Sequence, residues 1–232
     1  MKNTTSFART GYIMWLSLSV ITFITFAIAI LTPPLSGPLC PADCFQYPFL
    51  DIASRFPRDY YWMYTAILLY IVYIACLVVL HQSTRKSKKF LSHTALLFGF
   101  AGSLILITDY FLQITVIQPA LLNNETDGIS MLTQYNPHGV FIALEELGYL
   151  LISITFLLYA LLFKGKGLNR AVKIVFLTGF ILNLLALLLT CLAYGIHREY
   201  YYEIAAISIV WLVFIPNGAM IALLFKRLTR KP

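Results

Sequence analysis

The feature that most constrains this chain is the recurrence of apolar stretches about twenty residues long. An α-helix needs roughly 20 apolar residues to cross the ~30 Å hydrocarbon core of a bilayer. A chain inside that core must also satisfy its own backbone hydrogen bonds, which a helix does. The sequence therefore predicts an all-α bundle of six transmembrane helices, over residues 12–32, 60–80, 92–118, 137–163, 171–194 and 204–225.

The connections between these stretches are too short to form a soluble domain. Only 12% of the residues are charged, whereas soluble chains carry about 25%. The first apolar stretch is too long for the core of a cleaved signal peptide, so we interpret it as a retained span. The sequence thus predicts one polytopic membrane domain over residues 1–232.

The basic residues are distributed unevenly between the two ends of the predicted helices. Only Arg55, Arg58 and Arg198 lie at one end, and the other fourteen of the seventeen lysines and arginines lie at the opposite end: Lys2, Arg9, Arg85, Lys86, Lys88, Lys89, Lys164, Lys166, Arg170, Lys173, Lys226, Arg227, Arg230 and Lys231. Cytoplasmic loops carry an excess of basic residues. We therefore predict a plasma or inner membrane protein with both termini in the cytoplasm.

The basic run "HQSTRKSKK" at residues 81–89 is the densest cluster of positive charge. Such a run next to a transmembrane helix is typical of contact with anionic lipid headgroups. A nucleic-acid site would need a folded basic surface, and no soluble domain is predicted here. The predicted partner is therefore the bilayer, and nucleic acid is excluded.

The first outer connection contains "CPADC", which places Cys40 and Cys44 on the exported side. A structural disulfide can persist there; free thiols, or a redox or metal role, are the alternatives. The following segment, residues 49–56, has apolar residues at helical spacing. It predicts a short amphipathic helix lying at the outer membrane surface, with a lid over an outward-facing cavity as the alternative.

Three carboxyl groups lie inside the predicted spans. Asp109 is on the third span, and Glu145 and Glu146 are adjacent on the fourth. At 1.5 Å per residue, Asp109 and Glu145 lie roughly 13 Å and 12 Å below the outer ends of their helices. Consecutive antiparallel spans are usually neighbours, and Gly102 would let a partner helix approach the third span closely. We therefore expect the three carboxyls at one depth between spans three and four.

Ionisable residues at such depth are costly and are functional by default. No lysine or arginine lies in the central part of any span, so we expect no counterion and at least one protonated acid. The alternative is structural: protonated acids and amides that only hold helices together. The candidate ligand-binding residues are Asp109, Gln113, His138, Glu145, Glu146, Tyr149, Asn183 and Asn217.

These residues favour a protein that binds a small ligand, an ion or a proton in an outward-facing pocket, with transport as an extension. A membrane enzyme acting on a lipid or isoprenoid is the alternative, although GxSxG, HExxH and phosphate-loop motifs are absent. A structural or sensor subunit is the third. The sequence assigns no cofactor and no metal site, because its four histidines, candidates for haem ligation, lie at helix ends: His81, His93, His138 and His197.

One long segment carries a resemblance. Residues 109–154, "DYFLQITVIQPALLNNETDGISMLTQYNPHGVFIALEELGYLLISI", resemble a group of small six-span membrane proteins of bacteria and archaea without assigned activity. The similarity extends over most of spans three to six, including "HREYYYE" at residues 197–203. The resemblance implies a prokaryotic inner-membrane protein and no catalytic residues.

Overall fold

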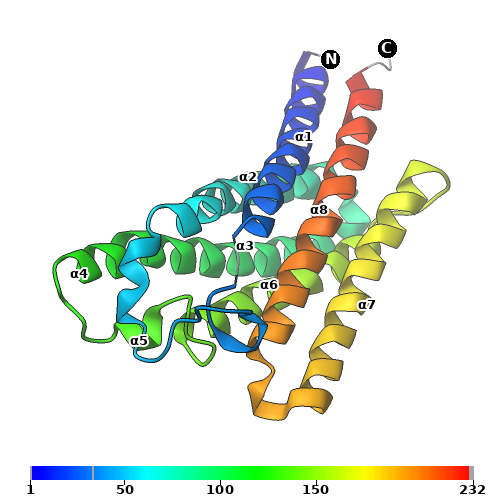
Figure 1. Cartoon of the computed structure of the whole chain (residues 1–232). Coiled ribbons are helices and arrows are strands. Elements are labelled where there is room, and N and C mark those ends of the chain that lie inside the picture. Colours follow the sequence, from blue (N-terminus) through cyan, green and yellow to red (C-terminus); the bar gives the residue numbers. More distant parts are fainter. Residues whose placement is uncertain (1, 33, 230–232) are drawn as a thin grey trace.

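The computed structural model of the chain describes residues 2–32 and 34–229, and the side chains from residue 5 onward. Within these ranges every regular element is helical (Figure 1). Six helical segments are long and apolar enough to cross a membrane: Thr5–Ile30, Arg58–Ser83, Lys86–Leu122, Val140–Ala160, Leu168–His197 and Glu199–Thr229. The predicted all-α, six-helix architecture is confirmed.

Most of the helices extend beyond at least one end of the apolar stretches from which they were predicted, whereas the fourth, over residues 140–160, is shorter than the predicted 137–163. The six spans are built on α1 (Lys2–Ile30), α2 (Tyr61–Ser83), α3 (Lys89–Leu112), α6 (Val140–Ala160), α7 (Leu168–Tyr194) and α8 (Glu199–Thr229). The third span continues through the π-helical η5 (Gln113–Ile117) into α4 (Gln118–Leu122). Hydropathy marks the part of a helix that suits hydrocarbon, whereas backbone hydrogen bonding decides where the helix ends.

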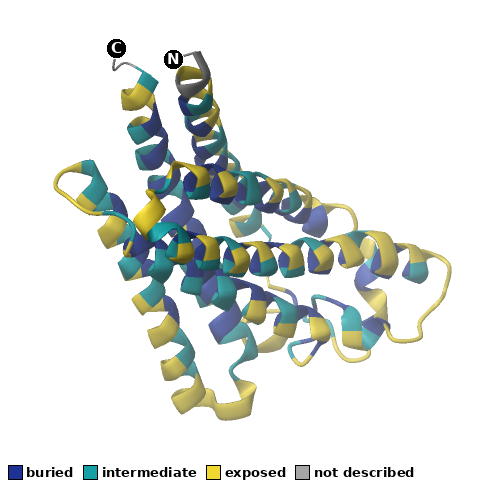
Figure 2. Cartoon of the chain, turned by 180° about the vertical axis from the view of Figure 1, so that it is seen from behind, coloured by how far each residue is buried: buried dark blue, intermediate teal, exposed yellow. Residues whose placement is uncertain are grey.

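Five of the long helices form a ring. α1 packs against α2, α2 against α3, α3 against α6, α6 against α8, and α8 returns to α1. α7 lies outside this ring, packs against α6 and α8, and is the least buried of the six spans. α1 and α8 lie side by side, with both chain termini at the same end (Figure 1). The view from behind shows buried residues where the helices meet and exposed residues along α7 (Figure 2).

α3 and α6, which carry the predicted carboxyl site, approach each other closely at two glycines. A Cβ atom on Gly102 of α3 would lie 2.7 Å from the carbonyl oxygen of Gly148 on α6. A Cβ atom on Gly148 would lie 2.6 Å from Cγ of Leu106. Small residues of this kind let helix backbones approach closely in a membrane. The close approach predicted at Gly102 is confirmed, and it leaves α3 and α6 in direct contact.

α1 and α8 also approach closely, beside Pro216. A Cβ atom on Gly218 would lie 2.8 Å from the carbonyl oxygen of Trp15. Ser19 Oγ donates a hydrogen bond of 2.7 Å to the carbonyl of Ile215, one residue before the proline. Proline removes a backbone donor from a helix, and neighbouring hydroxyls commonly bond backbone carbonyls nearby.

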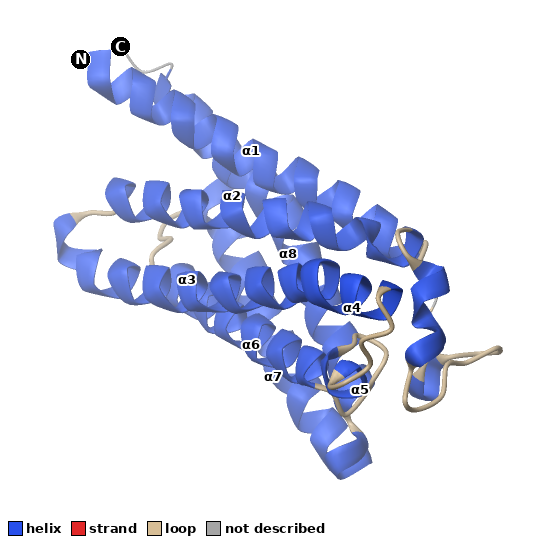
Figure 3. Ribbon diagram, turned by 90° about the vertical axis from the view of Figure 1, so that its left-hand side faces the viewer, coloured by secondary structure: helices blue, strands red, loops and turns tan. Residues whose placement is uncertain are grey.

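Most irregular segments gather at one end of the bundle (Figure 3). They contain short helical turns, namely η1 (Gly37–Leu39), η2 (Leu50–Arg55), η3 (Arg58–Tyr60), α5 (Ile129–Leu132) and η6 (Gly195–His197). The segment predicted as an interfacial helix at residues 49–56 is a 3₁₀ helix, and Ile52 on it is fully buried against the protein. It contacts α4, at the end of the third span.

The opposite end carries the basic turn η4 (Lys86–Lys88). Lys88 Nζ donates hydrogen bonds to the carbonyls of Leu161 and Leu162 at the end of α6. Lys89 Nζ likewise donates to the carbonyl of His81 near the end of α2. Cations at helix C-termini satisfy unpaired carbonyls and the negative end of the helix dipole. Two lysines of this basic run therefore stabilise helix ends as well as adding positive charge.

Candidate functional site

A cavity of about 280 Å³ lies inside the ring, toward the end where the long connections gather. It is lined by α1, α2, α6 and α8, by the connection after α1, and by Gln134 and Tyr135 before α6. Glu145, fully buried on α6, lines it. The pocket expected between spans three and four is therefore misplaced: α3 and α6 close against each other at Gly102 and Gly148. The space lies on the α8 side of α6 instead.

The walls of this cavity are mainly aromatic and aliphatic, with a few polar groups. Its tryptophans are Trp62 and Trp211, whose ring centroids are 6.1 Å apart. Its acidic side chains are Glu145 and Glu203. Within the described ranges of the chain, no lysine, arginine or histidine lines the cavity. A ligand here would meet two carboxyl groups and an apolar, π-rich surface.

Glu203 is the functional candidate that sequence reasoning missed. The sixth span predicted from hydropathy, 204–225, begins one residue after Glu203, yet Glu203 lies inside α8 and is only 9% exposed. Its carboxyl interacts electrostatically with that of Glu145 on α6. A signal was present in the helical spacing: residues 200, 203, 207 and 211 fall on one face of α8, and all four line the cavity.

A chain of buried hydrogen bonds ends on Glu145. Trp211 Nε1 donates to Tyr70 (3.0 Å), and Tyr70 donates to Tyr149 (3.0 Å). The Tyr149 and Tyr110 hydroxyls are 2.8 Å apart, and Tyr110 donates to Oε1 of Glu145 at 2.6 Å. A tyrosine hydroxyl has a single proton to donate, and that of Tyr110 goes to Glu145, so Tyr149 donates to Tyr110 and all four bonds run toward the carboxyl. The chain joins α8, α2, α6 and α3 and fixes the orientation of Glu145.

The second oxygen of Glu145 has no such partner. Its Oε2 atom is buried and has no partner with hydrogen-bond geometry among the described residues, although the Glu203 carboxyl lies close enough to interact with the Glu145 carboxyl as a hydrogen-bonding group. Oδ2 of Asp109, a buried residue on α3, also has no hydrogen-bond partner among the described residues. Asp109 interacts electrostatically with Glu145 but does not line the cavity. Buried polar atoms normally have a partner, so the unpaired oxygen that belongs to a cavity-lining residue indicates where a ligand would bind.

Glu146 belongs to a different environment from its neighbour. Its Oε1 atom lies 2.6 Å from Nη1 of Arg198, in the connection between α7 and α8. Partial burial opposes the charge of Arg198, but the hydrogen bond and charge of Glu146 raise the pKa of Arg198 above its ordinary value. The expectation that no counterion is present is wrong for Glu146, because a residue at a helix end reaches inward along α6. Adjacent helix positions point about 100° apart, which separates the two glutamates.

The remaining predicted residues do not join the cavity. Gln113 holds the connection between α4 and α6, since its Nε2 donates to the carbonyl of Leu132 and its Oε1 accepts from the backbone N–H of Gln134. Asn183 accepts a 2.8 Å hydrogen bond from the Tyr202 hydroxyl, between α7 and α8.

Asn217 and His138 also lie apart from the cavity. Asn217 is fully buried, and neither of its amide atoms has a hydrogen-bond partner among the described residues. His138 is exposed, and its Nδ1 lies 2.8 Å from Oε1 of Glu199. Of the eight predicted residues, only Glu145 lines the cavity, and Tyr149 supports it through the hydrogen-bond chain.

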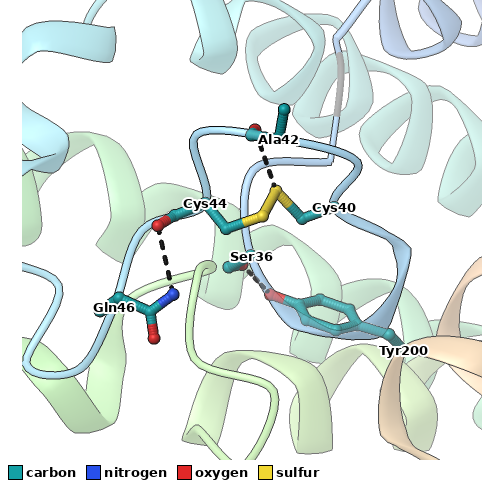
Figure 4. Close-up of a disulfide and its surroundings, with 6 residues drawn as sticks. All are labelled: Ser36, Cys40, Ala42, Cys44, Gln46 and Tyr200. Atoms are coloured by element: carbon teal, nitrogen blue, oxygen red, sulfur yellow. Dashed lines mark hydrogen bonds between the residues drawn. A yellow bond between two sulfur atoms is a disulfide. The ribbon is translucent and has the colours of Figure 1, made fainter.

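The connection that follows α1 forms part of the cavity lining. Figure 4 shows this connection where Ser36 meets Tyr200 and where Cys40 and Cys44 are joined. Ser36 Oγ and the Tyr200 hydroxyl are 2.7 Å apart, and both residues line the cavity. Gly37 has a φ of 67°, and a Cβ atom there would lie 2.2 Å from the Tyr200 ring. Cys40 and Cys44 form a disulfide just beyond this contact. Glycine thus permits the approach to Tyr200, and the disulfide restrains the chain that makes it.

Comparisons with protein-family models, with curated proteins and with solved structures gave no match for this chain. The resemblance of residues 109–154 to prokaryotic membrane proteins therefore stays a prediction. The six long apolar helices are those of a multi-pass membrane protein, and its function has to be inferred from the cavity.

Proposed function

We propose that this protein binds a small amphipathic amine in the cavity lined by Glu145 and Glu203. The observation that carries the proposal is the pairing of two buried carboxyls from different helices in one aromatic cavity. Burying charge without a partner is costly, and the cost falls when an opposite charge binds nearby. An ammonium group would supply that charge and would gain from the adjacent indole faces of Trp62 and Trp211.

The rest of the cavity suits the apolar part of such a ligand. Phe26 and Ile30 of α1, with Ile204 and Ile207 of α8, form apolar walls. The volume of about 280 Å³ lies near the lower limit of typical small-molecule pockets, roughly 300–1,000 Å³. The cavity therefore favours a short-chain amine over a bare metal ion, which would need more polar ligands.

The proposal places both termini in the cytoplasm and the cavity toward the exported side of a plasma or inner membrane. The uneven distribution of lysine and arginine supports this orientation. A basic cavity of about 320 Å³ at the other end, lined by Arg85, Lys88 and Lys164, supports contact with anionic headgroups there. Labelling of a Glu125→Cys variant by a membrane-impermeant reagent only from the cytoplasmic face would contradict the orientation.

The binding experiment uses the tryptophans of the cavity as reporters. Purified protein in lipid nanodiscs is titrated with hexylammonium, hexanol and hexanoate while tryptophan fluorescence is recorded. Two of the three tryptophans line the cavity, so occupancy should change the signal. We expect hexylammonium to bind at least tenfold more tightly than hexanol, a difference of about 1.4 kcal/mol, and hexanoate to bind weakest.

Variants connect the signal to the carboxyls. Glu145→Gln and Glu203→Gln should each remove most of the preference for the amine, because an amide keeps the shape but loses the charge. Glu125→Gln is the matched control, since Glu125 is exposed in the second outer connection. Equal affinity for hexylammonium and hexanol, or an unchanged preference in the Glu145→Gln, Glu203→Gln double variant, would contradict the proposal.

A further inference from the structure

A second group of ligand-type side chains lies at the outer end of the bundle, apart from the cavity lining. His138 precedes α6, His197 ends η6 and Glu199 begins α8. Their ligand atoms all lie within 4.8 Å of one another. We propose that these three residues bind a divalent cation of the zinc class.

The donor set matches this chemistry. Two imidazole nitrogens and one carboxylate oxygen are a common protein ligand set for Zn²⁺, with a fourth position open to water. Bond lengths of about 2.0–2.2 Å in a tetrahedral site place ligand atoms roughly 3.3 Å apart. His138 Nδ1 and Glu199 Oε1 are 2.8 Å apart, and the two imidazole ring centroids are 6.0 Å apart. Small rotations of exposed side chains would bring all three atoms to the required spacing.

The nearest competing charge is already paired. Arg198 lies between His197 and Glu199 in the sequence, but its guanidinium is bound to Glu146 at 2.6 Å. Glu199 therefore keeps His138 as its partner in the described part of the chain. The His138 side chain is 61% exposed and that of Glu199 is 20% exposed, so a hydrated cation can reach the group from solution.

The other histidine pair of the chain provides the comparison. The His81 and His93 rings are also close, with centroids 5.6 Å apart. His81 Nδ1, however, is hydrogen-bonded to Ser92, and the neighbouring charges are lysines such as Lys89. Positive surroundings disfavour a cation, whereas a carboxylate favours one. Both pairs bring imidazoles together, but only the outer pair is in a ligand group that includes a carboxylate.

A cation in this position would join the start of α6 to the connection between α7 and α8. α6 carries Glu145, and α8, which follows that connection, carries Glu203. The metal would restrain the outer ends of two walls of the cavity. The inference does not depend on whether the cavity binds an amine.

The test uses the full chain in nanodiscs, purified with an affinity tag that contains no histidine. A Cys191→Ala background removes the exposed free thiol of α7, another zinc-type ligand. Co²⁺ is added as a spectroscopic probe, and Zn²⁺ is then titrated against it and against a chromogenic chelator. We expect one Zn²⁺ per chain and visible Co²⁺ absorption bands that Zn²⁺ abolishes.

Single variants then assign the ligands. His138→Ala, His197→Ala and Glu199→Gln should each weaken Zn²⁺ binding at least tenfold, and the His81→Ala, His93→Ala double variant should bind as the parent does. If an alanine variant is recovered poorly, His138→Gln or His197→Gln gives the same comparison. Unchanged Zn²⁺ affinity in the outer variants, a loss in the inner double variant, or no stoichiometric binding to the parent would overturn the site.

Discussion

The two sides on which α6 meets its neighbours differ in how closely the helices approach. Toward α3, Gly148 faces Gly102 and the backbones come into contact. Toward α8, Glu145 and Glu203 stand beside a cavity. The same helix therefore makes one closed interface, with α3, and one open interface, with α8. Small residues let α6 approach α3 closely, because membrane helices associate through packing of small residues. Larger side chains on the α8 side keep the two helices apart and leave the cavity.

Depth in the membrane was a poor guide to which carboxyls work together. Helix rise predicts one depth for Asp109 and Glu145, and they do interact electrostatically. Only Glu145, however, lines a cavity, and its partner there is Glu203 on a helix remote in sequence. Three variants would break or sharpen the comparison between the closed and the open interface.

The largest expected effect is on the closed interface. Gly102→Leu should destabilise the bundle by about 3 kcal/mol or more, because overpacking usually costs 1–3 kcal/mol and the opposing atom is backbone. Ala143→Leu places the same side chain at an exposed position of α6 and should cost far less. Denaturant unfolding in detergent, followed by circular dichroism, measures both. Similar losses in the two variants would contradict the close packing of α3 and α6.

An intermediate effect is expected where the two interfaces meet. Tyr110→Phe removes the hydrogen bond from α3 to Glu145 and should cost about 1.5–3 kcal/mol, the range for bonds to charged groups. Tyr73→Phe is the control, since the buried Tyr73 hydroxyl has no partner within the described residues. The same unfolding measurement applies. If Tyr73→Phe proves the more damaging change, the hydrogen-bond chain does not support Glu145.

The smallest expected effect concerns the connection after α1, which lines the cavity between α6 and α8. Cys40→Ser with Cys44→Ser opens a ring of only five residues, so the unfolding free energy should fall by at most about 2 kcal/mol. The chain that holds Ser36 against Tyr200 should move more freely. Quenching of tryptophan fluorescence by acrylamide should then increase, because Trp62 and Trp211 line the cavity below. A Cys191→Ser variant should leave quenching unchanged. If quenching increased in that variant as well, the disulfide would not be what restrains the connection over the cavity.

Several features were readable from local sequence because their causes are local. Gly102 indicates a close helix contact, and the structure has one. The fourth span is predicted to begin at residue 137, but α6 begins at Val140, with Gly139 as its N-terminal cap. The segment 49–56 was predicted to form a helix and does contain one, but its apolar side packs on the protein. Amphipathic spacing shows that a segment has an apolar face; it does not show whether lipid or protein covers that face.

The sequence by itself determined the six long helices and the burial of Glu145, because a hydrocarbon environment imposes both helix length and the cost of a buried charge. Only the tertiary structure decided that Arg198 reaches Glu146, that Glu203 shares a cavity with Glu145, and that His138 lies beside His197. These pairs join helices remote in sequence. Their contacts depend on how each helix is rotated and tilted within the ring, which packing across all its neighbours sets together.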